Sequence, residues 1–425
     1  MKVDFGYPGI PSLEIRDSNL IGIYQPNPYR CDTDEEVVIQ KGLANPIGTR
    51  PLRELVKPGQ RILILVDDYT RTTPAWKIIP LVLEELRSVG LKDQDISILI
   101  AQGTHRKMSL RDKEKKLGKS ILKQITVYDH EWNNEKALTY IGDTDSGIPV
   151  WINKLVREFD FIMGIGHIVP HNEAGFSGGG KIIQPGICGR LTTEATHWMS
   201  AAYNVADLMG KADGPVRREI EKIAKRAGLK FIINAVEDHQ GRIVGLFCGD
   251  PVLAFRQGCK VSSEIYGVRI PTRSDIVVID SYPCDTDFWV AAKAIFAASL
   301  AVREGGVIIL VTTCPEGIAP EHPEILNHCF MPFVDVECLV HQGHLANDRI
   351  GAAFLALVGN ITAVKAKCIL VSTGITPNVA EKLGFMTAET PQAALSKAYE
   401  LLGKDAKIMV FRHGSEIMPI VEPET

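Results

Sequence analysis

Two histidines, a glycine-rich turn and a lysine lie within one short stretch, GIGHIVPHNEAGFSGGGKIIQPG, at 164–186. His167 and His171 come first, and the turn that follows consists of Ser177, Gly178, Gly179, Gly180 and Lys181. Successive glycines let backbone N–H groups approach an anion such as a phosphate closely. A lysine at the end of such a turn can serve as a cation, a nucleophile or a covalent anchor. A loop that only makes tight turns needs none of these side chains, so the stretch is a candidate functional site.

Other polar side chains follow apolar runs that are typical of buried strands. They are Asp68, Thr70 and Arg71 after RILILV, His105 after ISILIA, and His167 and His171 after FDFIM. In open α/β sheets, ligands bind beyond the carboxyl ends of the strands. A single polar loop after a strand is weak evidence for a binding site. Polar residues after several neighbouring strands are stronger evidence for one. We therefore expect these side chains to meet along one edge of a sheet.

Trp289 and Lys293 lie four residues apart in the second half of the chain. A helix is predicted at 287–303, and this spacing puts both side chains on one face of it. The ordinary explanation is an amphipathic helix whose lysine reaches solvent. The functional explanation is that the pair completes a site in a cleft between two domains.

His197 lies in another predicted helix, TTEATHWMS. A single helical histidine is more often a surface or packed residue than a metal ligand. No second histidine stands at the spacing of a metal site, so a zinc site built only from protein ligands is poorly supported. If His197 binds a metal, the other donors must come from something other than nearby side chains.

The elements that position these residues alternate between strands and helices. Strands are predicted at 61–66, 96–101, 125–128, 159–163 and 229–235, and again at 275–279, 306–311, 368–371 and 408–411. Helices between strands imply parallel sheets covered on both faces. The chain of 425 residues is also too long for one ordinary domain. We predict an α/β fold of two domains, 1–270 with the lysine loop and 271–425, with mainly parallel sheets and an interdomain active-site cleft.

The composition argues against several classes of function. The net charge of -4 leaves no basic surface for nucleic acid, and 45% hydrophobic with 23% charged residues is ordinary for a globular protein. No apolar stretch reaches the ~18 residues that a membrane span needs, and the first residues lack a signal-peptide pattern. The nine cysteines are scattered without CxxC pairs, which is typical of reduced thiols. We expect a cytoplasmic protein that binds neither nucleic acid nor membranes.

Several segments together resemble the nickel-pincer lactate racemase (LarA-type) family. They are NPIGTRPLREL (45–55), DDYTRTTP (67–74), GTHR (103–106), GIPVWIN (147–153), HNEAGFSGGGKIIQPG (171–186) and YPCDTDFWVAAKA (282–294), together with His197. The resemblance extends over nearly the whole chain, and the pattern HxxAGFSGGxK is far more specific than a generic glycine loop. The family is built from two α/β domains with the active site between them.

The resemblance implies a cofactor and a role for each candidate residue. The cofactor is a nickel-pincer nucleotide, a pyridinium-3-thioamide-5-thiocarboxylate mononucleotide linked covalently to Lys181, with His197 as the protein ligand to nickel. Sulfur and imidazole donors suit Ni(II). The other implied roles are cofactor binding by Asp68, Thr70 and the turn 177–180, acid–base catalysis by His105 and His171, and substrate binding by Arg71, Lys293 and Trp289. Cofactor-biosynthesis proteins are implied as partners, because other proteins make the cofactor.

The implied chemistry suits a 2-hydroxy acid. Its C2–H bond is weakly acidic, so inversion by proton abstraction is difficult. Removal of hydride is easier when a base takes the hydroxyl proton and an electrophilic cofactor accepts the hydride. The intermediate is a planar 2-keto acid, and hydride returned to its other face gives the opposite configuration. We therefore expect a 2-hydroxyacid racemase or epimerase, which is an isomerase.

The chain departs from the lactate racemases at Trp289-Val290, where those enzymes have a Tyr-Gln pair. The change removes a hydroxyl and an amide, so we expect a 2-hydroxy acid other than lactate. The alternative from another class is a non-catalytic nucleotide- or anion-binding protein that retains the fold. A simple binder needs no acid–base pair, so the presence of both His105 and His171 favours the enzyme.

Overall fold

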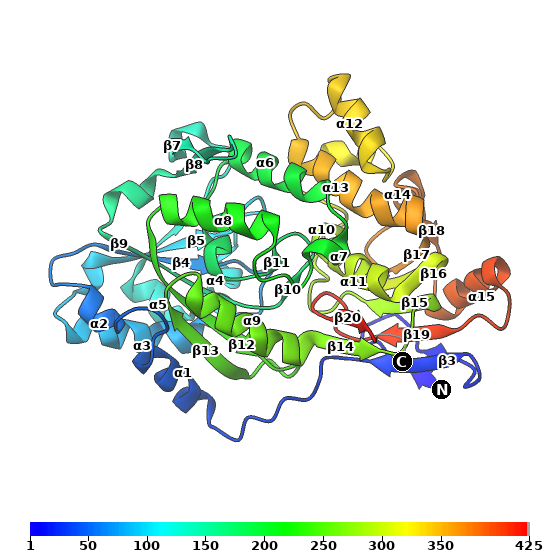
Figure 1. Cartoon of the computed structure of the whole chain (residues 1–425), viewed down its shortest axis with the longest axis horizontal. Helices are drawn as coiled ribbons and strands as arrows, with labels where there is room; N and C mark the ends of the chain where they lie inside the picture. The colour runs from blue at the N-terminus through cyan, green and yellow to red at the C-terminus, as the bar shows by residue number, and fades with distance from the viewer. Residues whose placement is uncertain (423–425) are drawn as a thin grey trace.

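Two six-stranded sheets, one in each lobe of the molecule, form the frame of the structure (Figure 1). The structure is a computed structural model that describes residues 1–422. The N-terminal lobe lies at the left of Figure 1, and the C-terminal lobe, coloured mainly yellow to red, lies at the right. The predicted α/β fold with mainly parallel sheets is confirmed.

The sheet of the N-terminal lobe has the strand order β13-β12-β9-β4-β5-β6. Its strands are β4 (Ile62–Asp67), β5 (Ile96–Ala101), β6 (Thr126–Asp129), β9 (Phe161–His167), β12 (Leu229–Glu237) and β13 (Ile243–Gly249). Neighbouring strands are parallel except β12 and β13. Ile64 and Leu65 of β4 enter different apolar clusters, because successive side chains of a strand point to opposite faces.

Helices cover both faces of this sheet. Residues of α3 (Ala75–Ser88) and α4 (Leu110–Leu117) share the cluster of Ile64, and residues of α8 (Pro215–Arg226) and α9 (Leu253–Tyr266) share the cluster of Leu65. This double cover explains why β4 and β5 are continuous apolar runs in the sequence. The polar residues that follow the strands therefore lie at the edge of the sheet, where the helices leave space.

The sheet of the C-terminal lobe has the order β18-β17-β16-β15-β19-β3, and all its neighbouring strands are parallel. Its strands are β3 (Leu20–Tyr24), β15 (Ser274–Asp280), β16 (Val302–Thr312), β17 (Ala366–Ser372), β18 (Met386–Thr387) and β19 (Ile408–Phe411). One face packs on α11 (Lys293–Ala301) and α13 (Arg349–Gly359), and the other packs on α15 (Pro391–Leu402). Lys293 thus begins a helix that is otherwise buried in the core of this lobe.

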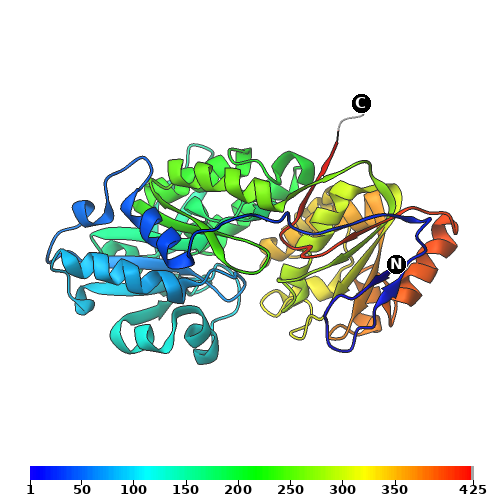
Figure 2. The same cartoon turned by 90° about the horizontal axis from the view of Figure 1, so that it is seen from below.

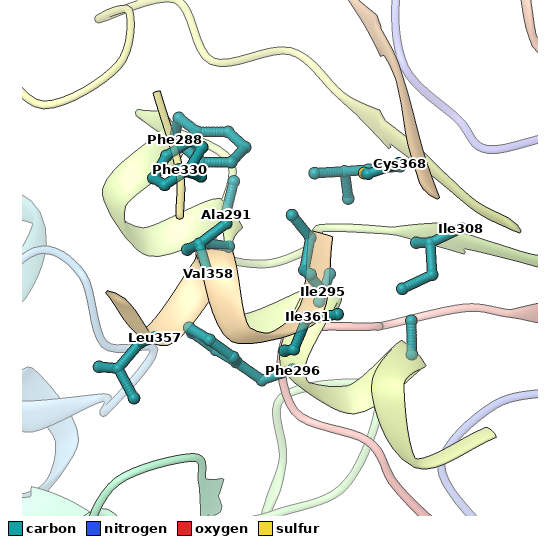
Figure 3. Packing of buried hydrophobic residues seen from close by; sticks show 14 of the residues in the cluster. Phe288, Ala291, Ile295, Phe296, Ile308, Phe330, Leu357, Val358, Ile361 and Cys368 are labelled. Carbon is teal, nitrogen blue, oxygen red and sulfur yellow. The ribbon is translucent and has the colours of Figure 1, made fainter. Parts of the chain in front are cut away.

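The helix predicted at 287–303 is divided into α10 (Phe288–Ala291) and α11, and it ends early because β16 begins at Val302. Figure 3 shows Phe288, Ala291 and Ile295 from this segment packed in one apolar cluster with Val358 of α13. This packing fixes the helix axis, and it leaves the first turn of α11 at the boundary between the lobes.

The first residues of the chain correct the predicted domain boundary. The prediction assigned 1–270 to one domain, but β3 pairs in parallel with β19 and belongs to the C-terminal sheet. Figure 2 shows the N-terminal segment in blue, running from that lobe across to the other. The last strand, β20 (Met418–Val421), in turn pairs with β14 (Gly267–Ile270). The two lobes are therefore connected by more than one segment. Within residues 1–422, no helix combines the length and apolar character of a membrane span.

Candidate active site

One cavity lies between the two lobes and is lined by residues of both. The N-terminal lobe contributes Asp68, Arg71, His105, His167, His171, Ser177, Gly178, Lys181 and His197. The C-terminal lobe contributes Trp289, Val290, Lys293, Phe296, Phe354 and Leu357. The structure thus brings together most of the side chains that the sequence singled out, and it does so beyond the ends of β4, β5 and β9.

His105 forms a close pair with Asp68. Its Nδ1 lies 2.7 Å from Oδ2 of Asp68, and the hydroxyl and N–H of Thr70 donate to Oδ1 at 2.6 and 3.1 Å. Burial raises the pKa of Asp68, but the charges of His105 and Arg71 and these hydrogen bonds outweigh burial and leave the pKa below its ordinary value. The carboxylate is therefore charged and accepts the Nδ1 proton of His105, which leaves Nε2 as the basic nitrogen. Thr70 lies outside the cavity wall and supports Asp68.

His171 has the opposite arrangement. It ends the short strand β10 (Pro170–His171), and its Nδ1 accepts hydrogen bonds from the N–H groups of Glu173 and Ala174 at 3.2 and 3.4 Å. Burial and then the charges of Lys181 and Lys293 lower the pKa of His171 well below its ordinary value. The ring is therefore neutral and carries its proton on Nε2. One histidine of the pair offers a lone pair, and the other offers an N–H.

Lys181 provides an amine of lowered basicity in the same cavity. It lies in the turn η4 (Gly179–Ile182), and its Nζ makes no hydrogen bond or ion pair with residues 1–422. Burial and then the charge of Arg71 lower the pKa of Lys181 to about 7. A substantial fraction of the amine is therefore neutral and nucleophilic at neutral pH.

Gly179 and Gly180 lie outside the cavity wall, and their predicted contact with the cofactor stays a prediction. A Cβ atom at Gly179 would lie 2.9 Å from the ring of Phe255, and one at Gly180 would lie 2.9 Å from Cβ of Ala224. The N–H of Gly179 donates to Oδ1 of Asn234 at 2.8 Å, so it is not available to an anion. These two glycines allow the turn to pack closely on α8 and α9.

His197 lies on α6 (Arg190–Ala201), which packs against α13 of the other lobe. Its Nδ1 lies 2.9 Å from the carbonyl oxygen of Thr193 and donates to it, so Nε2 keeps a lone pair. Burial lowers the pKa of His197, which keeps the ring neutral. No group of three or more His, Cys, Asp or Glu side chains among residues 1–422 could hold a metal ion. His197 can supply one nitrogen donor, and a metal here would need further donors from a bound group.

Arg71 and Lys293 bring two cations to the cavity from opposite lobes. Arg71 donates from Nη1 to the hydroxyl of Thr70 at 2.9 Å, and Nζ of Lys293 lies 3.5 Å from Sγ of Cys284. Burial and then the charge of Arg71 lower the pKa of Lys293. Glu416 lies near both cations, but burial raises its pKa to about 7, so it neutralises them only in part. An anionic ligand between Arg71 and Lys293 would relieve their repulsion.

Trp289 forms part of an aromatic stack at the wall of the cavity. Its indole lies 4.3 Å from the ring of His322 and 4.2 Å from the ring of Phe354, with interplanar angles of 15° and 24°. Trp289 and Phe354, with Val290 and Leu357, make much of the wall formed by the C-terminal lobe apolar. The position of Trp289 is therefore fixed by packing on more than one neighbour.

His167 and Phe354 are cavity residues to which sequence analysis gave no role. Nδ1 of His167 lies 2.9 Å from the hydroxyl of Thr73, which donates to Asp67, and its Nε2 is buried without a partner among residues 1–422. In the sequence, only the position of His167 close to His171 in the stretch 164–186 could have indicated that it lines the site. Phe354 lies on α13, whose residues after Arg349 are all buried, so no change of period distinguished it in the sequence.

Comparisons with known proteins assign the chain to a family. Residues 8–210 match the model of the lactate racemase N-terminal domain, and residues 270–419 match the model of the lactate racemase C-terminal domain. The chain is 34% identical over 418 residues to the lactate racemase of Thermoanaerobacterium thermosaccharolyticum, which covers 96% of each chain. The chain belongs to the lactate racemase family.

Other members and structures agree with this assignment. The family's enzyme from Lactiplantibacillus plantarum is 31% identical over 413 residues, which covers 95% of this chain and 96% of that one. The solved lactate racemase apoprotein of T. thermosaccharolyticum superposes with a TM-score of 0.85 over 99% of both chains. A protein from Thermotoga maritima, 22% identical, has the same fold with a TM-score of 0.75 over 91% of this chain and 98% of that chain. Membership of the lactate racemase family supports an isomerase of the racemase type.

Proposed function

We propose that this protein is a racemase or epimerase that inverts C2 of a 2-hydroxy acid by hydride transfer, through a 2-keto acid, with a nickel-pincer nucleotide as cofactor. The observation that carries the proposal is the arrangement of His105, His171 and Lys181 around one buried cavity. The two histidines offer a base and an N–H donor, and the lysine offers an amine for a covalent link. A protein that only binds an anion needs the cations alone.

The residues of the cavity fit such a cofactor. The amine of Lys181 has no partner among residues 1–422 and is suited to an amide-type link. Nε2 of His197 has a lone pair available to nickel. The buried Nε2 of His167 has no partner among residues 1–422 and can accept a hydrogen bond from a bound group. Asp68, Ser177 and Gly178 would contact the rest of the nucleotide. When bound, the cofactor supplies an acceptor for the hydride from C2.

Arg71 and Lys293 would hold the carboxylate of the substrate. They approach the cavity from opposite lobes, so an anion that bridges them also holds the lobes together. Charge-assisted hydrogen bonds of this kind are stronger than neutral ones. They would also keep the 2-keto acid in the site while it turns its other face towards the returning hydride. A racemase requires this turn, because it inverts the configuration at C2.

His105 and His171 would accept and return the proton of the C2 hydroxyl. In the structure Nε2 of His105 is ready to accept it, because Asp68 holds the other ring nitrogen in its protonated form. His171 is ready to donate a hydrogen bond from Nε2 to the C2 oxygen. For His171 to act as the base towards the opposite enantiomer, its proton must move to Nδ1. The ring must then release the N–H groups of Glu173 and Ala174.

The C-terminal side of the cavity favours a substrate other than lactate. Trp289 and Val290 are apolar where the family's lactate racemases carry Tyr-Gln, and Phe354 adds a further apolar ring. These side chains exclude water, which strengthens the electrostatic contacts of the reacting groups. We propose a 2-hydroxy acid whose side chain is larger than the methyl group of lactate.

The proposal is tested by producing the chain together with the cofactor-biosynthesis proteins that we propose as its upstream partners. Intact mass should show an adduct that maps to Lys181, and the loaded protein should interconvert the enantiomers of at least one 2-hydroxy acid. Lys181→Arg keeps a long basic side chain but removes the nucleophilic amine, so it should lose both the adduct and the activity. An adduct without any racemisation across a panel of hydroxy acids would favour the alternative of a non-catalytic nucleotide-binding protein. The cytoplasmic location expected from the sequence stays a prediction.

A further inference from the structure

A second, smaller pocket shares part of its wall with the active-site cavity. Thr104, His105 and Trp289 line both spaces. His105 is the proposed base for the hydroxyl on C2. A substituent on C2 of a substrate bound there therefore lies close to the entrance of the second pocket, beside the indole of Trp289.

His322 lines this pocket and has an unused hydrogen-bond acceptor. The residue is 3% exposed and lines the pocket, and its Nδ1 lies 2.8 Å from Oδ1 of Asp348. The same oxygen of Asp348 caps α13 by accepting from the N–H of Gly351 at 2.8 Å. In the tautomer whose Nδ1 proton the carboxylate accepts, Nε2 has a lone pair. That atom is buried and has no hydrogen-bond partner among residues 1–422. A buried acceptor without a partner favours the binding of a group that donates a hydrogen bond to it.

The position of His322 is fixed independently of any ligand. Its ring stacks on Trp289 at 4.3 Å and lies 5.8 Å from the ring of Trp132 in the other lobe. Asp348 holds the ring from the side of Nδ1. The lone pair on Nε2 is therefore held in place before a ligand binds, which lowers the entropic cost of a hydrogen bond to it.

The charges of the pocket narrow the chemistry of its ligand. A carboxylate cannot donate to Nε2 of His322, and Asp287 and Glu321 in the wall would repel it. An ammonium group could donate to Nε2, but it has no lone pair with which to accept from the side chain of Thr104, which lines the same pocket. A hydroxyl is neutral, donates to Nε2, and can accept from the side chain of Thr104.

We propose that the second pocket binds the side chain of the substrate, and that the substrate is a 2-hydroxy acid carrying a further hydroxyl that donates to Nε2 of His322. The inference rests on the proposed function and deepens it by naming the substrate class, a 2-hydroxy acid hydroxylated on its side chain. Trp289 forms the platform along which the carbon chain lies. His322 is the substrate-binding residue that selects the hydroxyl.

The test compares two acids of equal chain length, 2,4-dihydroxybutanoate and 2-hydroxybutanoate, with the cofactor-loaded protein. The wild type should show a kcat/KM at least about tenfold higher for the dihydroxy acid, because a site built for a hydroxyl rejects the analogue that lacks it. The variant His322→Phe keeps a ring to stack on Trp289 and removes the acceptor, so the preference should vanish, mainly through KM. His322→Gln retains an acceptor and should recover part of the preference.

Binding without turnover gives a second readout. Calorimetric titration of the cofactor-loaded protein with each acid should give the same order of affinities and the same loss in His322→Phe, and circular dichroism checks that each variant folds. Equal use of both acids by an active wild type would overturn this inference and leave the proposed racemase intact. Preference for the dihydroxy acid that survives in His322→Phe would also overturn it. Failure to racemise either acid, or any other 2-hydroxy acid, would overturn the proposed function together with the inference.

Discussion

Nδ1 of His105 lies 2.7 Å from Oδ2 of Asp68, and this contact fixes which nitrogen of the histidine is basic. The two residues follow neighbouring parallel strands, β4 and β5, so the sheet itself sets their separation. The pKa of Asp68 is below its ordinary value, and the carboxylate stays charged throughout the neutral range. Nε2 of His105 is therefore available to a proton donor in the cavity.

Asp68→Asn should lower kcat by about 10²–10⁴-fold, the usual contribution of a positioned acid–base group. An amide keeps the shape of the side chain, but it can present its NH2 group to Nδ1, which then becomes the acceptor and moves the ring proton to Nε2. Steady-state kinetics of the loaded variant provide the measurement, with nickel content as the control for cofactor loading. A variant with full nickel content and the wild-type rate would show that Asp68 does not set the tautomer of His105.

Lys181 should react as a neutral amine at unusually low pH. Its pKa of about 7 lies below the ordinary 10.5, so the neutral fraction rises through pH 7 and is nearly complete at pH 8.5. The rate of acetylation of Lys181 in the cofactor-free protein, followed by peptide mass spectrometry, should rise with pH and level off near pH 8. The exposed Lys404 in the same sample is the internal reference. A rate at Lys181 that keeps rising to pH 10 would contradict the lowered pKa.

His197→Ala should reduce the nickel retained by the loaded protein and leave the fold intact. The substitution removes one imidazole donor, and no other set of three potential ligands among residues 1–422 could replace it. Mass spectrometry measures the nickel content, and the thermal unfolding temperature checks the fold. Together they distinguish loss of a metal ligand from loss of the folded structure. Unchanged nickel in a folded, loaded variant would remove His197 from the ligands.

Trp289→Tyr combined with Val290→Gln should shift activity towards lactate. Both positions line the cavity, and the double change introduces the hydroxyl and amide that the resemblance implies for lactate racemases. The single variant Trp289→Phe, which keeps an aromatic ring without adding polar groups, is the matched control. The measurement is racemisation of lactate and of larger 2-hydroxy acids by wild type and variants. If lactate is already the best wild-type substrate, these two residues do not exclude it.

Much of the fold follows from the pattern of apolar runs. The runs at 96–101 and 408–411 are β5 and β19 with the predicted bounds, because each is a continuous apolar strand between helices. The pairing of β3 with β19 could not be predicted, since a five-residue strand gives no sign of a partner in the last part of the chain. Pairing of that kind is decided by the assembled sheet and by the helices that cover it.

The candidate site was predictable where polar residues follow strands, as for Asp68 and His105. Gly179 and Gly180 were assigned to the cofactor because glycines also suit anion binding, whereas the structure uses them for close packing on Phe255 and Ala224. His322 gave no signal, because it lies in an irregular segment. Its importance comes from the stack on Trp289 and from an unpartnered nitrogen, which only the folded chain brings together.

The most direct test of the central claim uses a 2-hydroxy acid deuterated at C2 as substrate, in ordinary water, with the cofactor-loaded protein. The account predicts that the inverted product keeps its deuterium and that the reaction shows a primary isotope effect, because the deuterium leaves C2 as hydride and returns to the same carbon. Nuclear magnetic resonance of the product measures the deuterium retained. Inversion with exchange of the deuterium for solvent hydrogen would show proton abstraction by a histidine such as His105 or His171, and it would contradict hydride transfer in this site.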